Sequence, residues 1–148
     1  MKSAEDLLAR RVADHLLAQE GTGRIWGIVI EDARAGYARA HMTVKPEMTN
    51  GHGTAHGGMI FALADTAFAY ACNSRNQATV AASASIIFLA PAREGEVLLA
   101  EAREEAVAGR SGAYTVQVRK SDGTVIALFQ GQARTIGGQV ISSENHGV

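Results

Sequence analysis

Residues 57–74 read GGMIFALADTAFAYACNS, and this stretch decides the fold. The positions that share one helical face are all apolar: Ile60, Leu63, Ala64, Ala67, Phe68 and Ala71. The remaining faces are nearly as apolar, since they carry Met59, Phe61, Ala62, Ala69, Tyr70 and Cys72. A helix that is apolar on all sides is a buried helix, and this stretch is too short and too interrupted by polar residues to indicate a membrane span. We therefore expect other elements to enclose it.

Strand-like segments lie on both sides of this helix in the sequence. Residues 24–32 and 37–44 precede it, and residues 79–89, 95–105, 112–121 and 124–135 follow it. Ser121-Asp122-Gly123 is typical of a hairpin turn, and no helical segment separates the last four strands, so they are expected to form an antiparallel meander. The sequence thus predicts an α+β fold in which an antiparallel sheet curls around one long central helix.

The two ends of the chain have different patterns. Residues 3–20 are expected to form an amphipathic helix, capped by Ser3 and ended by Gly21 and Gly23. Its apolar stripe is Leu7, Leu8, Val12, Leu16 and Leu17. Residues 137–148 are polar, and a disordered tail is expected there. The length of 148 residues suits a single domain, placed over residues 1–136.

Composition excludes several classes of protein. The chain has 14 Lys+Arg against 15 Asp+Glu, a net charge of −1, which argues against nucleic acid as a partner. Cys72 is the single cysteine and cannot form an intrachain disulfide. The N-terminal residues lack the apolar segment of a signal peptide, and no apolar run is long enough for a membrane span. A cytoplasmic protein is expected.

Residues 50–58 read NGHGTAHGG and lie directly before the central helix. They are neither a phosphate loop nor a dinucleotide loop, because Gly-Lys-Ser/Thr is absent and His56 replaces the third glycine of the dinucleotide pattern. The spacing of His52 and His56 is that of a two-histidine metal site, but neither His41 nor Asp65 is fixed as a third ligand. The preferred interpretation is that both histidines organise the loop by hydrogen bonds, without a metal.

Gly57 and Gly58 occupy the expected start of the central helix. Their N–H groups are unpaired within the helix, and the positive end of the helix dipole lies here. Such a position suits a substrate carbonyl that becomes an oxyanion. The alternative is that the glycines only let the helix start against a neighbouring strand.

Asp65 lies among apolar residues in the middle of the same helix. Loss of hydration should raise the pKa of its carboxyl group and make it a better base. The alternative, a structural acid satisfied by Thr66, Ser83 or a backbone N–H, is less favoured, because buried carboxylates are costly. Gly57 and Asp65 are about 12 Å apart along one helix axis, too far to act on one carbonyl. Two antiparallel helices from two copies of the chain would bring them together, so a dimeric site is expected.

Weaker candidates accompany these residues. Ser83 and Ser85 share one face of the first strand after the helix, where either could bond a water molecule or the carboxylate. Small residues packed against the helix are an equal alternative. Asn50 could bond a carbonyl or a water molecule, or could be only a turn residue before Gly51.

The string from Asn50 through His56-Gly57-Gly58 to Asp65 resembles the hotdog-fold acyl-CoA thioesterases, in particular the phenylacetate-degradation (PaaI-type) branch. The resemblance extends to about Ile136. It implies hydrolysis of acyl-CoA thioesters, especially phenylacetyl-CoA and its ring-hydroxylated derivatives, without metal or cofactor. It also implies a homodimer that assembles into a homotetramer.

The resemblance also assigns roles. The Gly57 N–H would polarise the thioester carbonyl, and Asp65 of the partner subunit would activate water or attack directly. Asn50 and His56 would support the carbonyl side, and Ser83 would be a helper serine. Gly58 and Phe61 are expected to contact the substrate, with Met48 also near the acyl group.

Two other functions remain open from the sequence. A hotdog hydratase or dehydratase would use His56 and Asp65 on the carbons of the acyl chain. A non-catalytic acyl-CoA-binding module would need no desolvated base.

Overall fold

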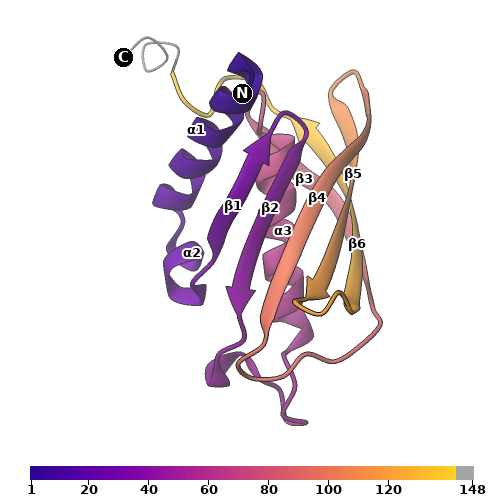
Figure 1. Ribbon diagram of the computed structural model, residues 1–148. Coiled ribbons are helices and arrows are strands. Elements are labelled where there is room, and N and C mark those ends of the chain that lie inside the picture. Colours follow the sequence, from indigo (N-terminus) through magenta and orange to yellow (C-terminus); the bar gives the residue numbers. More distant parts are fainter. Residues whose placement is uncertain (143–148) are drawn as a thin grey trace.

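The structure, a computed structural model, describes residues 1–142 (Figure 1). Its helices are α1 (Ala4–Gln19), α2 (Gly21–Trp26), the short 3-10 turn η1 (Pro46–Met48) and α3 (Gly57–Cys72). Its strands are β1 (Val29–Arg34), β2 (Tyr37–Thr43), β3 (Thr79–Phe88), β4 (Val97–Ala108), β5 (Ser111–Lys120) and β6 (Val125–Thr135). None of the helices in residues 1–142 is long and apolar enough to cross a membrane.

One six-stranded antiparallel sheet curls around α3, so the predicted α+β class is confirmed (Figure 1). The strand order is β1-β2-β4-β5-β6-β3. The predicted four-strand meander is wrong in one place, because β3 pairs with β6 at the edge of the sheet and β4 pairs with β2. Hydrophobic periodicity identifies strands but does not say which strands pair.

The helix expected to be buried is buried. Leu63, Ala64 and Ala67 are fully inaccessible, and Phe68 stacks edge-on against Tyr114 and tilted against Phe129. Much of the facing surface of the sheet is alanine, at positions 38, 40, 100, 102, 127 and 133. Small side chains let the sheet approach the helix closely, as the alanine-rich composition suggests.

Gly131 on β6 marks the closest approach of sheet and helix. A Cβ atom at this position would lie 2.8 Å from Cζ of Phe68. Gly131→Ala is therefore expected to lower the free energy of unfolding by about 1–3 kcal/mol, measured by urea denaturation. Gly21→Ala is the matched control, because no atom lies within 4 Å of its new methyl group, and it should change stability by less than about 1 kcal/mol. Equal stabilities for the two variants would contradict the packing described here.

The predictions for the N-terminal region need two corrections. Ser3 caps α1 by accepting a hydrogen bond from the Asp6 N–H, as predicted. Of the predicted stripe, Val12 is buried and Leu16 and Leu17 pack partly buried against the core, but Leu7 is exposed, and Ala9 and Ala13 are buried in addition. Alanines face β1 because they permit a close contact there. Residues 24–28 do not belong to a strand: α2 continues to Trp26, and Gly27 ends it with a left-handed φ of 67°.

The start of the predicted tail packs against the domain. Asn76 is buried, and its side chain accepts hydrogen bonds from the N–H groups of Val140 and Ile141 and donates one to the Ile141 carbonyl. Ile141 is itself buried. Residues 137–142 therefore differ from the disordered tail that their composition suggested. The rest of the predicted tail lies outside the described residues.

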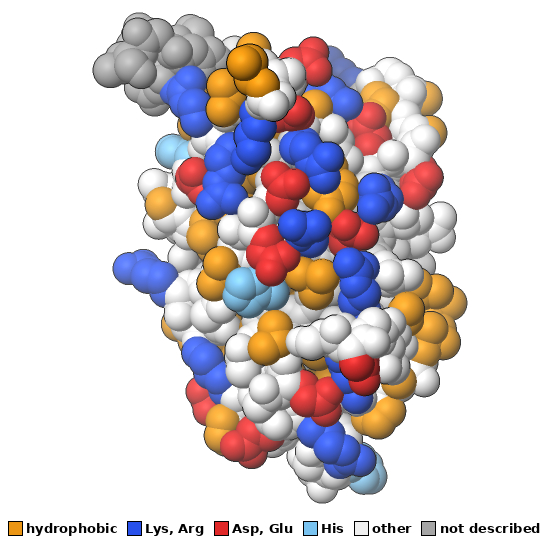
Figure 2. Space-filling view, in the orientation of Figure 1, with side chains coloured by type: hydrophobic (Ala, Val, Ile, Leu, Met, Phe, Trp, Pro, Cys, Tyr) orange, Lys and Arg blue, Asp and Glu red, His pale blue; other side chains and the backbone are white. Residues whose placement is uncertain are grey.

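The outer face of β1, β2 and β4 carries interleaved positive and negative side chains (Figure 2). Glu31 binds both Arg39 and His41, and Glu101 binds Arg103 and Arg119. Exposed pairs of this kind stabilise a fold little.

Candidate active site

The N-terminus of α3 presents one free backbone N–H group. His56 is the N-cap residue, and its Nδ1 accepts a hydrogen bond from the Gly58 N–H at 2.9 Å. Within residues 1–142 no acceptor takes the N–H of Gly57. The two glycines, equivalent in the sequence, thus differ in the structure: Gly57 can donate to a ligand, whereas the N–H of Gly58 is already engaged.

Phe88, which the sequence reasoning missed, covers this helix end. A Cβ atom on Gly57 would lie 3.0 Å from Cζ of Phe88. Phe88 is half exposed and lines a groove of about 410 Å³ together with Asn50, Gly57, Ile60 and Leu89. The groove thus combines a free N–H with an apolar wall. Phe88 is revealed only by the position of β3 against α3, which depends on the pairing of β3 with β6 and is not visible in the sequence.

The loop before α3 is held by Asn50. Its Oδ1 accepts hydrogen bonds from the N–H groups of His52 (2.9 Å) and Thr54 (3.2 Å), and its Nδ2 donates to Thr54 Oγ1 at 3.0 Å. These contacts support the interpretation of Asn50 as a turn residue. Asn50 nevertheless borders the same groove as Gly57, so it fixes the loop that flanks the free N–H.

The described residues contain no group of three or more His, Cys, Asp or Glu side chains that could hold a metal ion. The His56 ring instead caps α3 through Nδ1. His56 and Asp65 are nine residues apart, about 13.5 Å along one helix axis. The pair that a hydratase would need is therefore not formed within this chain.

Asp65 lies on the one open face of α3. This face also carries the half-buried side chains of Phe61, Ala62, Ala69 and Cys72. Burial raises the pKa of the Asp65 carboxyl group, as the sequence predicts. No hydrogen-bond donor of residues 1–142 satisfies the carboxylate: Thr66 donates to the Ala62 carbonyl and Ser83 to Gln132. The alternative that Asp65 is a purely structural acid therefore lacks the hydrogen-bond donors that it requires.

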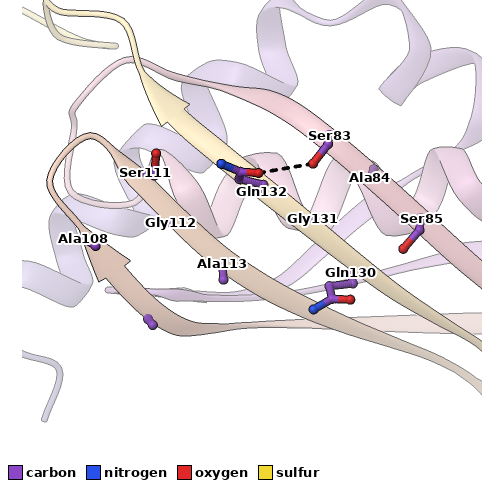
Figure 3. Close-up of a pocket in the computed structure, with 11 residues that line it drawn as sticks. Ser83, Ala84, Ser85, Ala108, Ser111, Gly112, Ala113, Gln130, Gly131 and Gln132 are labelled. Carbon is purple, nitrogen blue, oxygen red and sulfur yellow. Dashed lines mark hydrogen bonds between the residues drawn. The ribbon is translucent and has the colours of Figure 1, made fainter.

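Three residues that were expected to contact the substrate do not line the groove at Gly57. Ser83 lies on the outer face of the sheet, beside Gln132 of β6 and away from α3 (Figure 3). Its neighbours Ala84 and Ile86 occupy the inner face instead, opposite Gly131 and Phe129. Met48 is buried in the core. Phe61 keeps a partly accessible ring, which packs edge-on against Phe129 at 5.3 Å.

The cavity in Figure 3, of about 510 Å³, belongs to this outer face. Its walls are serine, alanine and glutamine side chains, and neither Gly57 nor Asp65 reaches it. The serines that were expected at the active site therefore line a separate surface.

A sheet curled around one long helix, with a free amide at the helix start and a desolvated carboxylate along it, defines a thioester hydrolase of the hotdog fold. The chain belongs to the thioesterase superfamily, whose family model matches residues 52–127. The predicted resemblance to the PaaI type is confirmed by the sequence and the solved structure of a PaaI protein.

The chain is similar to the acyl-coenzyme A thioesterase PaaI of Escherichia coli (strain K12). The two are 38% identical over 128 residues, which cover 86% of this chain and 91% of the relative. A putative esterase of Deinococcus radiodurans is 45% identical over 108 residues, covering 72% of this chain and 73% of that protein. The solved structure of the E. coli PaaI protein from the phenylacetic acid degradation operon matches with a TM-score of 0.90 at 37% identity, covering 92% of this chain and 99% of that one.

Proposed function

We propose that the protein hydrolyses acyl-CoA thioesters, with phenylacetyl-CoA and its ring-hydroxylated derivatives as preferred substrates. The observation that carries the proposal is the pair of unsatisfied groups on α3: the free N–H of Gly57 and the unpartnered carboxylate of Asp65. The Gly57 N–H can stabilise a developing oxyanion, and the Asp65 carboxylate can act as a base or a nucleophile.

The active site forms between two copies of the chain. Asp65 does not line the groove at Gly57, and eight residues of helix separate the two groups. β3 is an edge strand with mostly exposed residues, and α3 has an open face beside it. A second copy that pairs at this edge would bring its α3 antiparallel to the first, with Asp65 of the partner subunit beside Gly57.

The proposed hydrolysis requires only the Gly57 N–H, the Asp65 carboxylate of the partner subunit and water. The Gly57 N–H binds the thioester carbonyl oxygen, and Asp65 of the partner subunit takes a proton from water or attacks the carbonyl carbon itself. In the water route the hydroxide oxygen bonds to the carbonyl carbon, and the carbonyl electron pair moves to the oxygen at Gly57. Collapse of this intermediate breaks the C–S bond and releases CoA thiolate, which takes up a proton. A thiol of pKa about 8.5 leaves without a strong general acid.

The walls of the groove favour an aromatic acyl group. Phe88, next to Gly57, offers an exposed ring for edge or offset stacking, and Phe61 lies on the open face of α3.

The proposal is tested by a thiol-release assay with arylacetyl, benzoyl and straight-chain CoA thioesters. We expect thiol release, with kcat/KM for the arylacetyl esters at least about 10-fold above that for straight chains of similar size. Equal or higher kcat/KM on straight chains would contradict the acyl preference. Binding without thiol release would indicate a binding module, and a change at the acyl carbons without thiol release would indicate a hydratase.

A further inference from the structure

A cavity of about 290 Å³ lies where the C-terminal end of α3 meets the turn that joins β4 to β5. Cys72, the last residue of α3, forms part of its wall, as do Arg75 and Arg110. Cys72 follows Asp65 by two helical turns, so both half-buried side chains lie on the open face of α3, about 10 Å apart along the helix axis. The cavity therefore continues the face that carries the proposed catalytic carboxylate.

Arg75 is held in place at the wall of this cavity. Its guanidinium group donates two hydrogen bonds to the Glu104 carboxylate, at 2.6 and 3.2 Å, and Glu104 also accepts one from the Tyr114 hydroxyl at 2.9 Å. Gly36 packs against the same guanidinium group, since a Cβ atom there would lie 3.3 Å from Nη2 of Arg75. Glu104 is the one carboxylate among the residues that line the cavity, and Arg75 neutralises its charge.

Arg110 differs from Arg75, because none of the carboxylates in residues 1–142 forms an ion pair with it. Arg110 is exposed on the β4–β5 turn, and its carbonyl accepts a hydrogen bond from the Thr135 N–H, which ties the turn to β6. Arg134 of β6 lies opposite Ser111, the residue after Arg110, and it too has no ion pair within the described chain. This end of the sheet therefore carries uncompensated positive charge.

The groove at Gly57 and the cavity at Cys72 differ in charge. Among the described residues, no charged side chain lines the groove at Gly57, whereas two arginines and one carboxylate line the cavity at Cys72. A CoA thioester is asymmetric in the same way, with an uncharged acyl group on one side of the sulfur and phosphates on the other. The pantetheine arm that separates the sulfur from the phosphates has about thirteen bonds, or about 15 Å when extended. An arm that starts at Asp65 therefore reaches into the cavity.

We propose that the cavity at Cys72 receives the phosphate groups of coenzyme A, which Arg110 binds directly and Arg75 binds from its fixed position. The pantetheine arm then lies along the open face of α3, where the small side chains of Ala69 and Cys72 leave room for it. Guanidinium groups bind phosphate through paired, charge-assisted hydrogen bonds. This inference rests on the proposed function, because it takes Asp65 as the place where the thioester reacts.

Arg110→Gln tests the proposal, because it removes the charge and keeps a polar side chain. We expect KM for phenylacetyl-CoA to rise by about 5- to 20-fold with kcat within about twofold, since the lost contact is to a part of the substrate that does not react. Phenylacetyl-pantetheine lacks the nucleotide, so kcat/KM for this thioester should differ by less than about twofold between the variant and the wild type. Adenosine 3′,5′-bisphosphate should inhibit the wild type competitively and the variant at least about 5-fold more weakly.

Arg24→Gln is the matched control. Arg24 is exposed on α2, far from the β4–β5 turn (Figure 1), and it also has no ion pair within residues 1–142. Its KM for phenylacetyl-CoA should match that of the wild type. An equal rise in KM for both variants would show that net charge is the cause and would contradict the inference.

The remaining outcomes separate the inference from the proposed function. If Arg110→Gln hydrolyses phenylacetyl-CoA as the wild type does, or loses as much activity on phenylacetyl-pantetheine as on phenylacetyl-CoA, the inference is wrong and the proposed function stands. If the wild type hydrolyses neither thioester, or if Asp65→Asn retains full activity, the proposed function fails and the inference fails with it.

Discussion

Replacement of Asp65 by asparagine is expected to lower kcat by about 10²- to 10⁴-fold, with KM nearly unchanged. Asparagine has the same shape but neither accepts the proton nor attacks the thioester. Thiol release from phenylacetyl-CoA under saturation measures the loss. A kcat for this variant within twofold of the wild-type value would indicate that the protein is a non-catalytic binding module.

The same substitution should stabilise the fold at neutral pH. Burial holds the folded-state pKa of Asp65 above its unfolded value, so ionisation costs the folded state free energy once the pH rises above about 4. The asparagine variant has no such cost, so its thermal midpoint should exceed that of the wild type at pH 7. The difference in thermal midpoint should disappear as the pH falls through the ordinary pKa range of an aspartate side chain. Stability lost for the sake of activity is common at active sites.

Asp122→Asn is the control for this effect. Asp122 lies in the β5–β6 turn, where the hydrogen bond from the Thr124 N–H holds the pKa of its carboxyl group below the usual range. Its charge therefore does not oppose folding at pH 7. Asp122→Asn should leave activity unchanged and should not raise the thermal midpoint. A rise equal to that of Asp65→Asn would show that net charge, not burial, is the cause.

Gly57→Ala is expected to lower kcat/KM by about 10- to 100-fold. The N–H remains, so the loss should be smaller than the roughly 10²- to 10³-fold effect of removing an oxyanion donor outright. The new methyl group would lie 3.0 Å from Cζ of Phe88, so the ring must shift at the proposed site of the substrate carbonyl. Alanine suits the first turn of a helix, so the fold should remain intact.

Gly51→Ala serves as the matched control for Gly57→Ala. It lies in the loop before α3, and a methyl group there meets no atom within 4 Å. It should retain wild-type kcat/KM. Unchanged activity in Gly57→Ala would mean that the substrate does not approach this helix end.

The parts of the fold that depend on local pattern could be predicted from the sequence. The apolar faces of residues 57–74 predict the enclosed helix α3, and its all-apolar character predicts a sheet curled around it. The burial of Asp65 follows from its neighbours on that helix, so the raised pKa could be predicted too. These features depend on residues close in the chain.

Features that depend on distant contacts could not be predicted. β3 lies at the far edge of the sheet, paired with β6, because β4 occupies the place beside β2. No pattern in the sequences of these strands indicates which of them pair. Ser83 was assigned to the wrong face, because alanine and serine alternate along β3 and both are small enough for either side. The difference between Gly57 and Gly58 depends on the orientation of one side chain, that of His56.

Mixing two defective variants tests the shared active site most directly. Asp65→Asn and Gly57→Ala chains, unfolded together and refolded, would form mixed dimers in which one cleft joins an unaltered Gly57 to an unaltered Asp65. Random pairing restores about a quarter of all clefts, so thiol release should rise toward roughly 25% of the wild-type rate, well above that of either variant alone. A mixture no more active than the average of its two components would contradict an active site built from both subunits.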